Sequence, residues 1–207
     1  MEISDTRERL LAAAASEFIR HGFARANVGK IAEAAGVSKK TIYVHFVSKE
    51  ALFVAAAQDG LHKARLSEVL SVADDQSPSR VLTRFLREVL DLALSARGRA
   101  AYRLVMSEAP GFAGLLHAYR ASIEDAVIQP LALWLQRKVD LGAFAIEDTR
   151  MAASMLIHMV LSEQLRDVAL GGFPVPRPTV RTALVRQAVA LFVKGAALDN
   201  TAPIDRR

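Results

Sequence analysis

A short helix, a glycine turn and a second short helix follow one another closely, and this pattern constrains the fold more than any other feature. Across residues 28–35, apolar side chains recur at helical spacing, so the first helix has one apolar side. Gly36 follows, where a left-handed residue ends a helix at little cost. Ser38 can cap the second helix, whose Ile42 and Phe46 lie four residues apart on a buried side. Because so short a turn makes two helices cross steeply, the second one can enter the major groove of DNA.

The excess of positive charge is concentrated around these two helices. The chain of 207 residues holds 27 Lys and Arg against 22 Asp and Glu, a formal net charge of +5. Residues 20–49 contain six of the basic residues and a single acid, Glu33, so this segment carries the whole excess. A local cluster of this kind can neutralise DNA phosphates, whereas charge that only keeps a protein soluble is usually spread around the surface. A solvated face is the alternative explanation.

Helical periodicity dominates the rest of the chain as well. Glycine and proline fall between the periodic segments, and strand-like alternation does not extend beyond a few positions. The sequence therefore predicts an all-α fold with about nine helices. Residues 1–47 are expected to form a three-helix domain with a helix-turn-helix, and residues 48–207 a larger helical domain.

Several helix ends can be predicted from caps and breakers. The first helix is expected to start at Ser4 or Asp5 and to stop before Gly22. A fourth helix is expected over residues 48–73. A later, long helical pattern contains Pro130, which should kink or divide it.

The composition argues against several classes of protein. The chain has no cysteine, which excludes disulfides and thiolate metal sites and fits a reducing cytoplasm. No run approaches 18 apolar residues and the first residues do not form a secretory signal, so we expect a soluble, cytoplasmic protein without a membrane partner. Motifs of metalloproteases, serine hydrolases and phosphate-binding loops are missing, so we expect no catalytic residue, no metal and no cofactor. An enzyme of another kind is kept as an alternative.

Residues 7–54 resemble the TetR/AcrR family of one-component bacterial transcriptional regulators. The resemblance rests on three stretches, which are LLAAA followed by Phe18 and Gly22-Phe23, then VGKIAEAAGVS, then TIYVHFVSKEAL. Chain length and the expected number of helices also agree with the family. The resemblance implies an N-terminal DNA-binding domain followed by a domain for ligand binding and dimerisation.

The resemblance implies roles for side chains on and around the second short helix. Its first three residues would face base edges, since Lys can donate to guanine and a Thr methyl can touch the thymine methyl. Later side chains, together with backbone amides at the helix starts, would hold phosphates. The predicted DNA-binding residues are Asn27, Lys30, Ser38, Lys39, Lys40, Thr41, Tyr43, His45 and Lys49. Gly29 departs from the family, in which a long polar residue often stands there and can reach a base, and Lys40 stands where small residues are common.

The resemblance also implies that a small molecule binds in the larger domain and then releases the DNA. Bulky residues of mixed character, Tyr119 among them, are available to line a cavity and suit an apolar or aromatic ligand. The predicted ligand-binding residues are Tyr102, Arg103, Met106, Phe112, His117, Trp134, Met155, His158 and Met159. For each of them, the plain core or a surface ion pair is the alternative place.

A helix at 180–194 carries a broad apolar face that needs cover. It can dock on its own domain, or it can pair with the same helix of a second copy, which a two-fold DNA site favours. Together with a helix at 147–169 it is expected to form a four-helix dimer interface. The predicted interface residues are Met151, Met155, Val180, Leu184, Ala188 and Leu191.

These expectations combine into one functional hypothesis. The chain is expected to be a ligand-responsive transcriptional regulator, a repressor, which binds a palindromic double-stranded operator as a homodimer. A small apolar or aromatic effector would release it. The alternative is a constitutive DNA-binding dimer whose larger domain serves only dimerisation, and a closed apolar cavity in that domain would argue against this alternative.

Overall fold

The structure is a computed structural model that describes residues 2–63, 66–71, 76–111 and 113–197. In these ranges it contains α-helices and one π-helical turn but no strand, so the all-α prediction is confirmed. The segments are α1 (Glu2–Arg25), α2 (Val28–Ala35), α3 (Lys39–His45), α4 (Lys49–His62), α5 (Leu66–Leu70), α6 (Pro78–Leu94), α7 (Ala96–Glu108), α8 (Ala113–Ile123), η1 (Glu124–Ile128), α9 (Gln129–Asp140), α10 (Thr149–Ala169) and α11 (Pro178–Ala196). None of the described helices is both long and apolar enough to cross a membrane.

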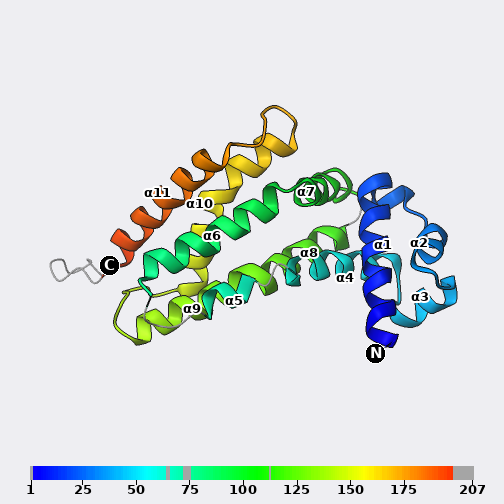
Figure 1. Cartoon of the computed structure of the whole chain (residues 1–207), viewed down its shortest axis with the longest axis horizontal. Coiled ribbons are helices and arrows are strands. Elements are labelled where there is room, and N and C mark those ends of the chain that lie inside the picture. The colour runs from blue at the N-terminus through cyan, green and yellow to red at the C-terminus, as the bar shows by residue number, and fades with distance from the viewer. Residues whose placement is uncertain (1, 64–65, 72–75, 112, 198–207) are drawn as a thin grey trace.

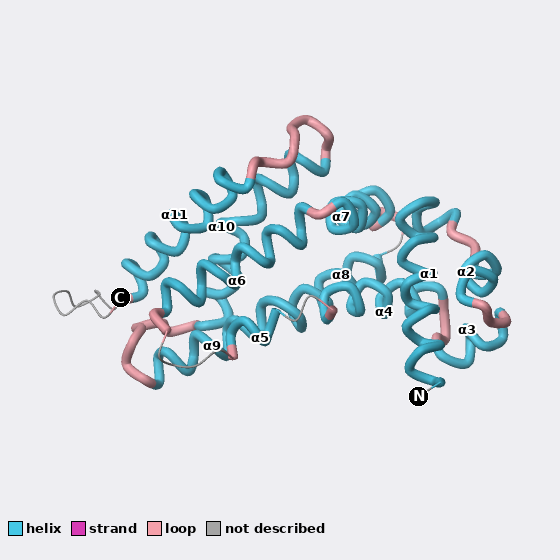
Figure 2. Tube along the Cα trace, in the orientation of Figure 1, coloured by secondary structure: helices cyan, strands magenta, loops and turns pink. Residues whose placement is uncertain are grey.

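The helices form an elongated molecule. Figure 1 shows α1, α2 and α3 gathered at one end, and α10 with α11 at the other. Between them, α4 leads away from α1 and packs on α8, and α7 lies between α6 and α1. Figure 2 shows that short loops join most helices, with longer ones around α10. α7 connects the two ends, because it packs against α1 and also against α10.

α1 differs from its prediction at its start, and its helical backbone is interrupted at Gly22, where the prediction places its end. It starts at Glu2 rather than at Ser4 or Asp5, because side chains that can cap a helix do not oblige it to begin there. Gly22 has φ 78° and ψ 166°, which bends the chain where the helix was expected to stop. Helical bonding then resumes for one turn, since the Ala26 amide donates to the Gly22 carbonyl at 3.1 Å. The first run of helical backbone thus ends before Gly22 as predicted, and one further turn follows the kink.

The expected fourth helix is divided, as is the long helix that contains Pro130. α4 ends at His62 rather than near residue 73, and α5 is a separate short helix. The physical reason is that α4 buries Phe53 in the core beside α1, whereas α5 buries Leu66 in a second core. The π-helical turn η1 directly precedes the helix turn with Pro130, so the predicted interruption is confirmed. These two divisions turn the nine expected helices into the eleven α-helical segments described above.

The core of the helix-turn-helix end is centred on three aromatic rings. Phe18 stacks on Phe23 with ring centroids 5.8 Å apart, and Phe53 of α4 meets them edge-on at 5.3 and 5.7 Å. Leu104 of α7 is buried in the same cluster. The core therefore continues past the expected domain boundary between residues 47 and 48, because α4 and α7 help to build it.

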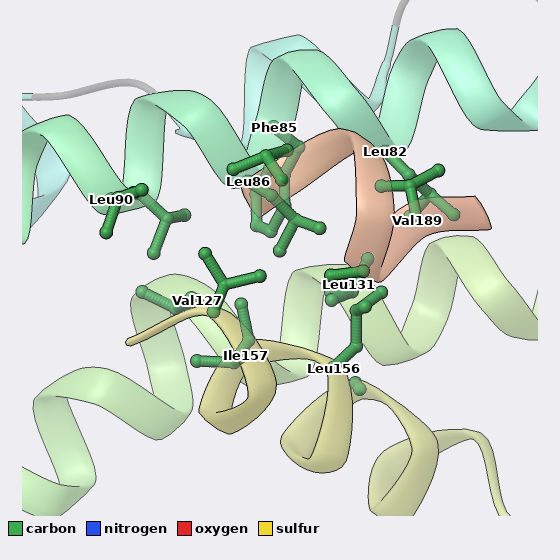
Figure 3. Close-up of a cluster of buried hydrophobic side chains, with 14 of the residues drawn as sticks. Leu82, Phe85, Leu86, Leu90, Val127, Leu131, Leu156, Ile157 and Val189 are labelled. Atoms are coloured by element: carbon green, nitrogen blue, oxygen red, sulfur yellow. The ribbon is translucent and has the colours of Figure 1, made fainter. Parts of the chain in front are cut away.

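The second core fills the space between α6, η1, α9, α10 and α11. Figure 3 shows its side chains converging from these helices. The labelled residues are Leu82, Phe85, Leu86, Leu90, Val127, Leu131, Leu156, Ile157 and Val189, and all of them are buried. α6 contributes four of them, because its apolar residues repeat every three or four positions along one face.

Candidate functional site

The helix-turn-helix geometry follows from local caps. The Asn27 side chain accepts from the Gly29 amide at 2.7 Å and so caps α2. Gly36 has φ 69° and ψ 37°, and its amide donates to the carbonyl of Glu33 while the Val37 amide donates to Ala32, which is the Schellman ending of a helix. The left-handed glycine therefore turns the chain toward α3.

α3 presents its polar side chains to solvent. The Ser38 hydroxyl accepts from the Thr41 amide at 3.1 Å and also bonds the Thr41 hydroxyl at 2.9 Å, so the Thr41 methyl is the group left for an apolar contact. Ile42 and Phe46 are buried as expected. The side chains of Lys30, Lys39, Lys40, Tyr43 and His45 are all exposed. Exposed cations and a phenol on a short helix can contact a nucleic acid, and these roles stay predictions.

Gly29 leaves room for a neighbouring lysine. A Cβ placed on Gly29 would lie 2.6 Å from Cε and 3.1 Å from Nζ of Lys39. The end of the Lys39 side chain thus lies over the first turn of α2. At the position where relatives often carry a long polar residue, this chain has a glycine, and Lys39 occupies the space.

The side chain of Lys49, one of the predicted DNA-binding residues, makes contacts within the protein. Its Nζ donates to the carbonyl of Ala24 at 3.0 Å and lies 5.0 Å from the centroid of the Phe23 ring. On the other side, the Ala24 amide donates to Oε2 of Glu108 at 2.9 Å. The peptide groups of Ala24 are therefore bonded to α4 through Lys49 and to α7 through Glu108. We call this pair of bonds the Ala24 clamp.

A cavity lies between the helix-turn-helix end and the second core. It has a volume of about 180 Å³ and is lined by residues of α1, α4, α5, α6, α7, α8, η1 and α10. Phe18, Phe53 and Leu104 line it and also belong to the core of the helix-turn-helix end. The lining is apolar except for the side chains of Ser95, Arg97 and Tyr119. A concave, mostly apolar space with a few polar groups is what a small-molecule site requires.

Tyr119 contributes the one phenol of this lining. Its hydroxyl has no hydrogen-bond partner among the described residues. Burial, with a smaller contribution from Tyr102, raises the pKa of Tyr119 to about 12. The phenol is therefore neutral at physiological pH and can donate to a bound molecule.

Among the described residues, none of the predicted ligand-binding residues lines this cavity, and their role in ligand binding stays a prediction. Trp134 is buried on α9, with Lys138 Nζ 5.5 Å from its ring and Phe144 packed at 6.5 Å. Tyr102 is half-buried, and Phe112 lies outside the described residues. The exposed ones are Arg103, Met106, His117, Met155, His158 and Met159. The reason is that the cavity walls are mostly Leu, Ala, Ile and Val, which no local pattern distinguishes from ordinary core; Tyr119 alone of the bulky candidates reaches the lining.

The predicted dimer residues are divided between surface and core. Met151, Met155, Val180 and Leu191 are exposed, so they are free to meet a partner. Leu184 is half-buried and packs against the second core. Ala188 is only 3% exposed within the single chain, because that side of α11 packs on α6, and it cannot form the predicted seam.

In the ranges that the structure describes, no three His, Cys, Asp or Glu side chains come together to hold a metal ion. The helix-turn-helix and the cavity are therefore the features to compare with known proteins.

Two family models match the chain. Residues 10–56 match the bacterial regulatory proteins of the tetR family, and residues 80–195 match the C-terminal domain of the AefR-like transcriptional repressor. The HTH-type transcriptional regulator TtgR of Pseudomonas putida is 36% identical over 101 residues, which are 47% of this chain and 48% of that protein. The chain thus aligns with about half the length of this relative. The regulator SrpR of Pseudomonas putida is 25% identical over 185 residues, 83% of this chain and 85% of that protein.

Solved structures share the whole fold. A structure from Mesorhizobium loti assigned to the TetR family has a TM-score of 0.83 at 20% identity and covers 96% of this chain and 100% of its own. The Flavonoid-responsive Regulator FrrA has a TM-score of 0.72 at 24% identity, covering 93% and 97%. Because the second family model alone spans more than half of the residues, the chain belongs to the TetR family of bacterial transcriptional regulators.

Proposed function

We propose that this chain is a cytoplasmic transcriptional repressor that binds a pseudo-palindromic operator as a homodimer and leaves it when a small apolar or aromatic molecule enters the cavity. The observation that carries the proposal is that Phe18, Phe53 and Leu104 are shared between the cavity and the core beneath the helix-turn-helix. A molecule in the cavity touches the side chains that position the DNA-binding helices. Ligand and DNA are thereby linked through one packed cluster.

DNA binding is supported by the surface of α3. Lys39, Lys40 and Thr41 begin the helix, which has no acid in its first turn, and Tyr43 and His45 follow on the exposed side. We assign base contacts to the first three and phosphate contacts to the others, with Asn27, Ser38 and Lys30 at the flanking helix starts. In a dimer, two α3 helices would lie about 34–36 Å apart, one turn of DNA.

Dimerisation is supported by a continuous exposed apolar stripe on α10. Met151, Met155 and Met159 follow one another at four-residue spacing and are all exposed. Val180 and Leu191 are exposed on the adjacent α11. Two copies that pair these helices about a two-fold axis would cover both faces in a four-helix arrangement.

Ligand response is supported by the size and position of the cavity. Its volume of about 180 Å³ is close to the roughly 150 Å³ of an apolar cavity that holds benzene. The name of the structural neighbour FrrA describes a regulator that responds to an aromatic class of molecule. Both α4 and α7 line the cavity and reach the Ala24 clamp, so their displacement would be transmitted to the segment that enters α2.

Two measurements test this function. Selection of bound duplexes from a random DNA pool should recover a pseudo-palindrome, and recovery of only asymmetric sites or single strands would refute the DNA-binding proposal. Apolar compounds are then titrated with and without the recovered operator. By linkage, a ligand that releases DNA must bind the free protein more tightly than the complex, by a coupling of about 1–3 kcal/mol. Equal affinity in both states would leave a constitutive dimer.

A further inference from the structure

We infer that the cavity is built for an effector with a carboxylate, whose apolar body fills the space and whose charge pairs with Arg97 at the mouth. This inference rests on the proposed ligand response and names the chemical class of the ligand. Three observations carry it: the hydrogen bonds already made by the polar groups of the lining, the absence of a partner for Arg97 among the described residues, and the distribution of charge around Arg97.

The polar groups of the lining are not equally available. The Ser95 hydroxyl donates to the Leu92 carbonyl at 2.7 Å and accepts from the Gly98 amide at 3.0 Å. It caps α7 and offers little to a ligand. Arg97 and Tyr119 are the remaining polar side chains of the lining, one a fixed cation and the other a neutral phenol.

Arg97 has no ion pair and no hydrogen bond within the described part of the chain. Its guanidinium lies against α4 where Gly60 leaves space, since a Cβ on Gly60 would be 3.9 Å from Nε and 4.0 Å from Nη2. The neighbouring acid on α4, Asp59, is paired with Lys63 at 3.0 Å. The donors of Arg97 are therefore uncommitted beside an apolar cavity.

The charge around Arg97 favours an anion. Arg97 and Arg99 both lie near the start of α7, whose first turn contains no acid. Cations at a helix N-terminus are opposed by the helix dipole, so a bound anion removes an unfavourable interaction. The same field disfavours a positively charged effector.

The position of Arg97 also limits the cost of pairing. Its side chain is exposed, so an ion pair would form at the boundary between the cavity and water and the two charges would stay partly hydrated. A planar guanidinium can hold both carboxylate oxygens at once. Tyr119 stays neutral and adds no repulsion, and the volume of about 180 Å³ suits a body of one aromatic ring or a short alkyl chain.

The test compares acids with uncharged analogues on the full chain. Hexanoate, phenylacetate and 4-ethylbenzoate are titrated calorimetrically beside their primary amides and the corresponding amines. We expect the acids to bind about tenfold more tightly than the amides, and the amines to bind most weakly. Arg97→Gln should abolish the preference for acids while leaving amide binding unchanged. Arg120→Gln, which removes an exposed charge next to Tyr119 outside the lining, should keep the preference.

The possible results separate the two proposals. Equal affinities for acids and amides, or an acid preference that survives Arg97→Gln, would overturn the carboxylate assignment while the ligand-binding cavity stands. Binding by none of the three classes would overturn both. Because Arg97 is exposed and unpaired, its substitution should not unfold the protein, and a circular dichroism melt of Arg97→Gln checks this.

Discussion

Substitution of Gly22 tests the Ala24 clamp, because a side chain at this position would meet the Glu108 carboxylate that bonds the Ala24 amide. Gly22 has φ 78° and ψ 166°, a region that side-chain-bearing residues rarely enter, and a Cβ there would lie 2.5 Å from Oε1 of Glu108. Gly22→Ala should therefore impose backbone strain of about 1–3 kcal/mol and also displace the Glu108 carboxylate from the Ala24 amide. A hydrogen bond to a charged group is worth about 1.5–3 kcal/mol, and the exposure of this one argues for the lower value.

Gly36→Ala is the matched control. Gly36 also has a positive φ, 69°, but a Cβ there would meet nothing within 4 Å. Its replacement should lower the free energy of unfolding by about 1–2 kcal/mol, because alanine is strained in the left-handed conformation. Both alanine variants regain about 0.4–1 kcal/mol, because alanine lowers the conformational entropy of the unfolded chain relative to glycine. We therefore expect the free energy of unfolding to fall by about 2 kcal/mol more in Gly22→Ala than in Gly36→Ala. This difference corresponds to a urea midpoint that is lower by about 1 M.

The assay is urea unfolding followed by circular dichroism at one fixed protein concentration, because dimerisation would make the midpoint depend on concentration. Glu108→Ala completes a double-mutant cycle. Alone it should cost about 1.5 kcal/mol, whereas in the Gly22→Ala background it should cost almost nothing, since the bond is already broken. Equal losses for Gly22→Ala and Gly36→Ala, or full additivity with Glu108→Ala, would refute the clamp.

Three further predictions concern the DNA surface, the dimer and the cavity. Lys40→Ala should relax the preference for one base pair by about 1–3 kcal/mol in competition binding, while Tyr43→Phe should weaken all sites alike; equal losses would make Lys40 a phosphate contact. Met155→Glu places a charge on a side chain that is 63% exposed, and it should give monomers in ultracentrifugation unless the interface lies elsewhere. Because burial raises the pKa of Tyr119 above its ordinary value of 10.0 to about 12, stability should fall as pH rises above 10, where the unfolded chain ionises first. Tyr119→Phe should lose less stability between pH 9 and about pH 11 in urea unfolding, and an identical loss would contradict the burial of the hydroxyl.

Local chemistry allowed the helix-turn-helix to be predicted closely. Ser38 accepts the backbone bond of a cap and Gly36 is left-handed, both as expected, and Asn27 and Ser48 cap α2 and α4 in the same way. Such features depend on neighbours within four residues, so the sequence contains their whole cause. The buried Ile42 follows from the same short spacing.

Contacts between distant helices could not be predicted in this way. Periodicity predicts one broad apolar face on α11, but it cannot decide which part of that face its own domain covers, and Ala188 is buried within the single chain rather than available to a partner. Glu108 and Ala24 are 84 residues apart, and nothing near either of them indicates the bond. Arg97 does have a local signal, a cation in the first turn of a helix, which opposes the helix dipole and suggests a further partner.

The small volume of the cavity bears on how binding could lead to release. A molecule much smaller than about 180 Å³ can bind without pressing on Phe18, Phe53 or Leu104, and we expect such a ligand not to distinguish the DNA-bound arrangement from the free one, whereas a molecule that fills the cavity contacts all three. A ligand changes an equilibrium only by its difference in affinity between the two states. A larger acid that still reaches Arg97 must push α4 or α7 away from α1, because packed side chains leave no other space. We therefore expect binding and release to separate along a series of alkanoic acids, with short members that bind without effect and longer ones that lower operator affinity. Release that is equally strong for the shortest member that binds would show that volume is not what couples the cavity to the DNA-binding helices.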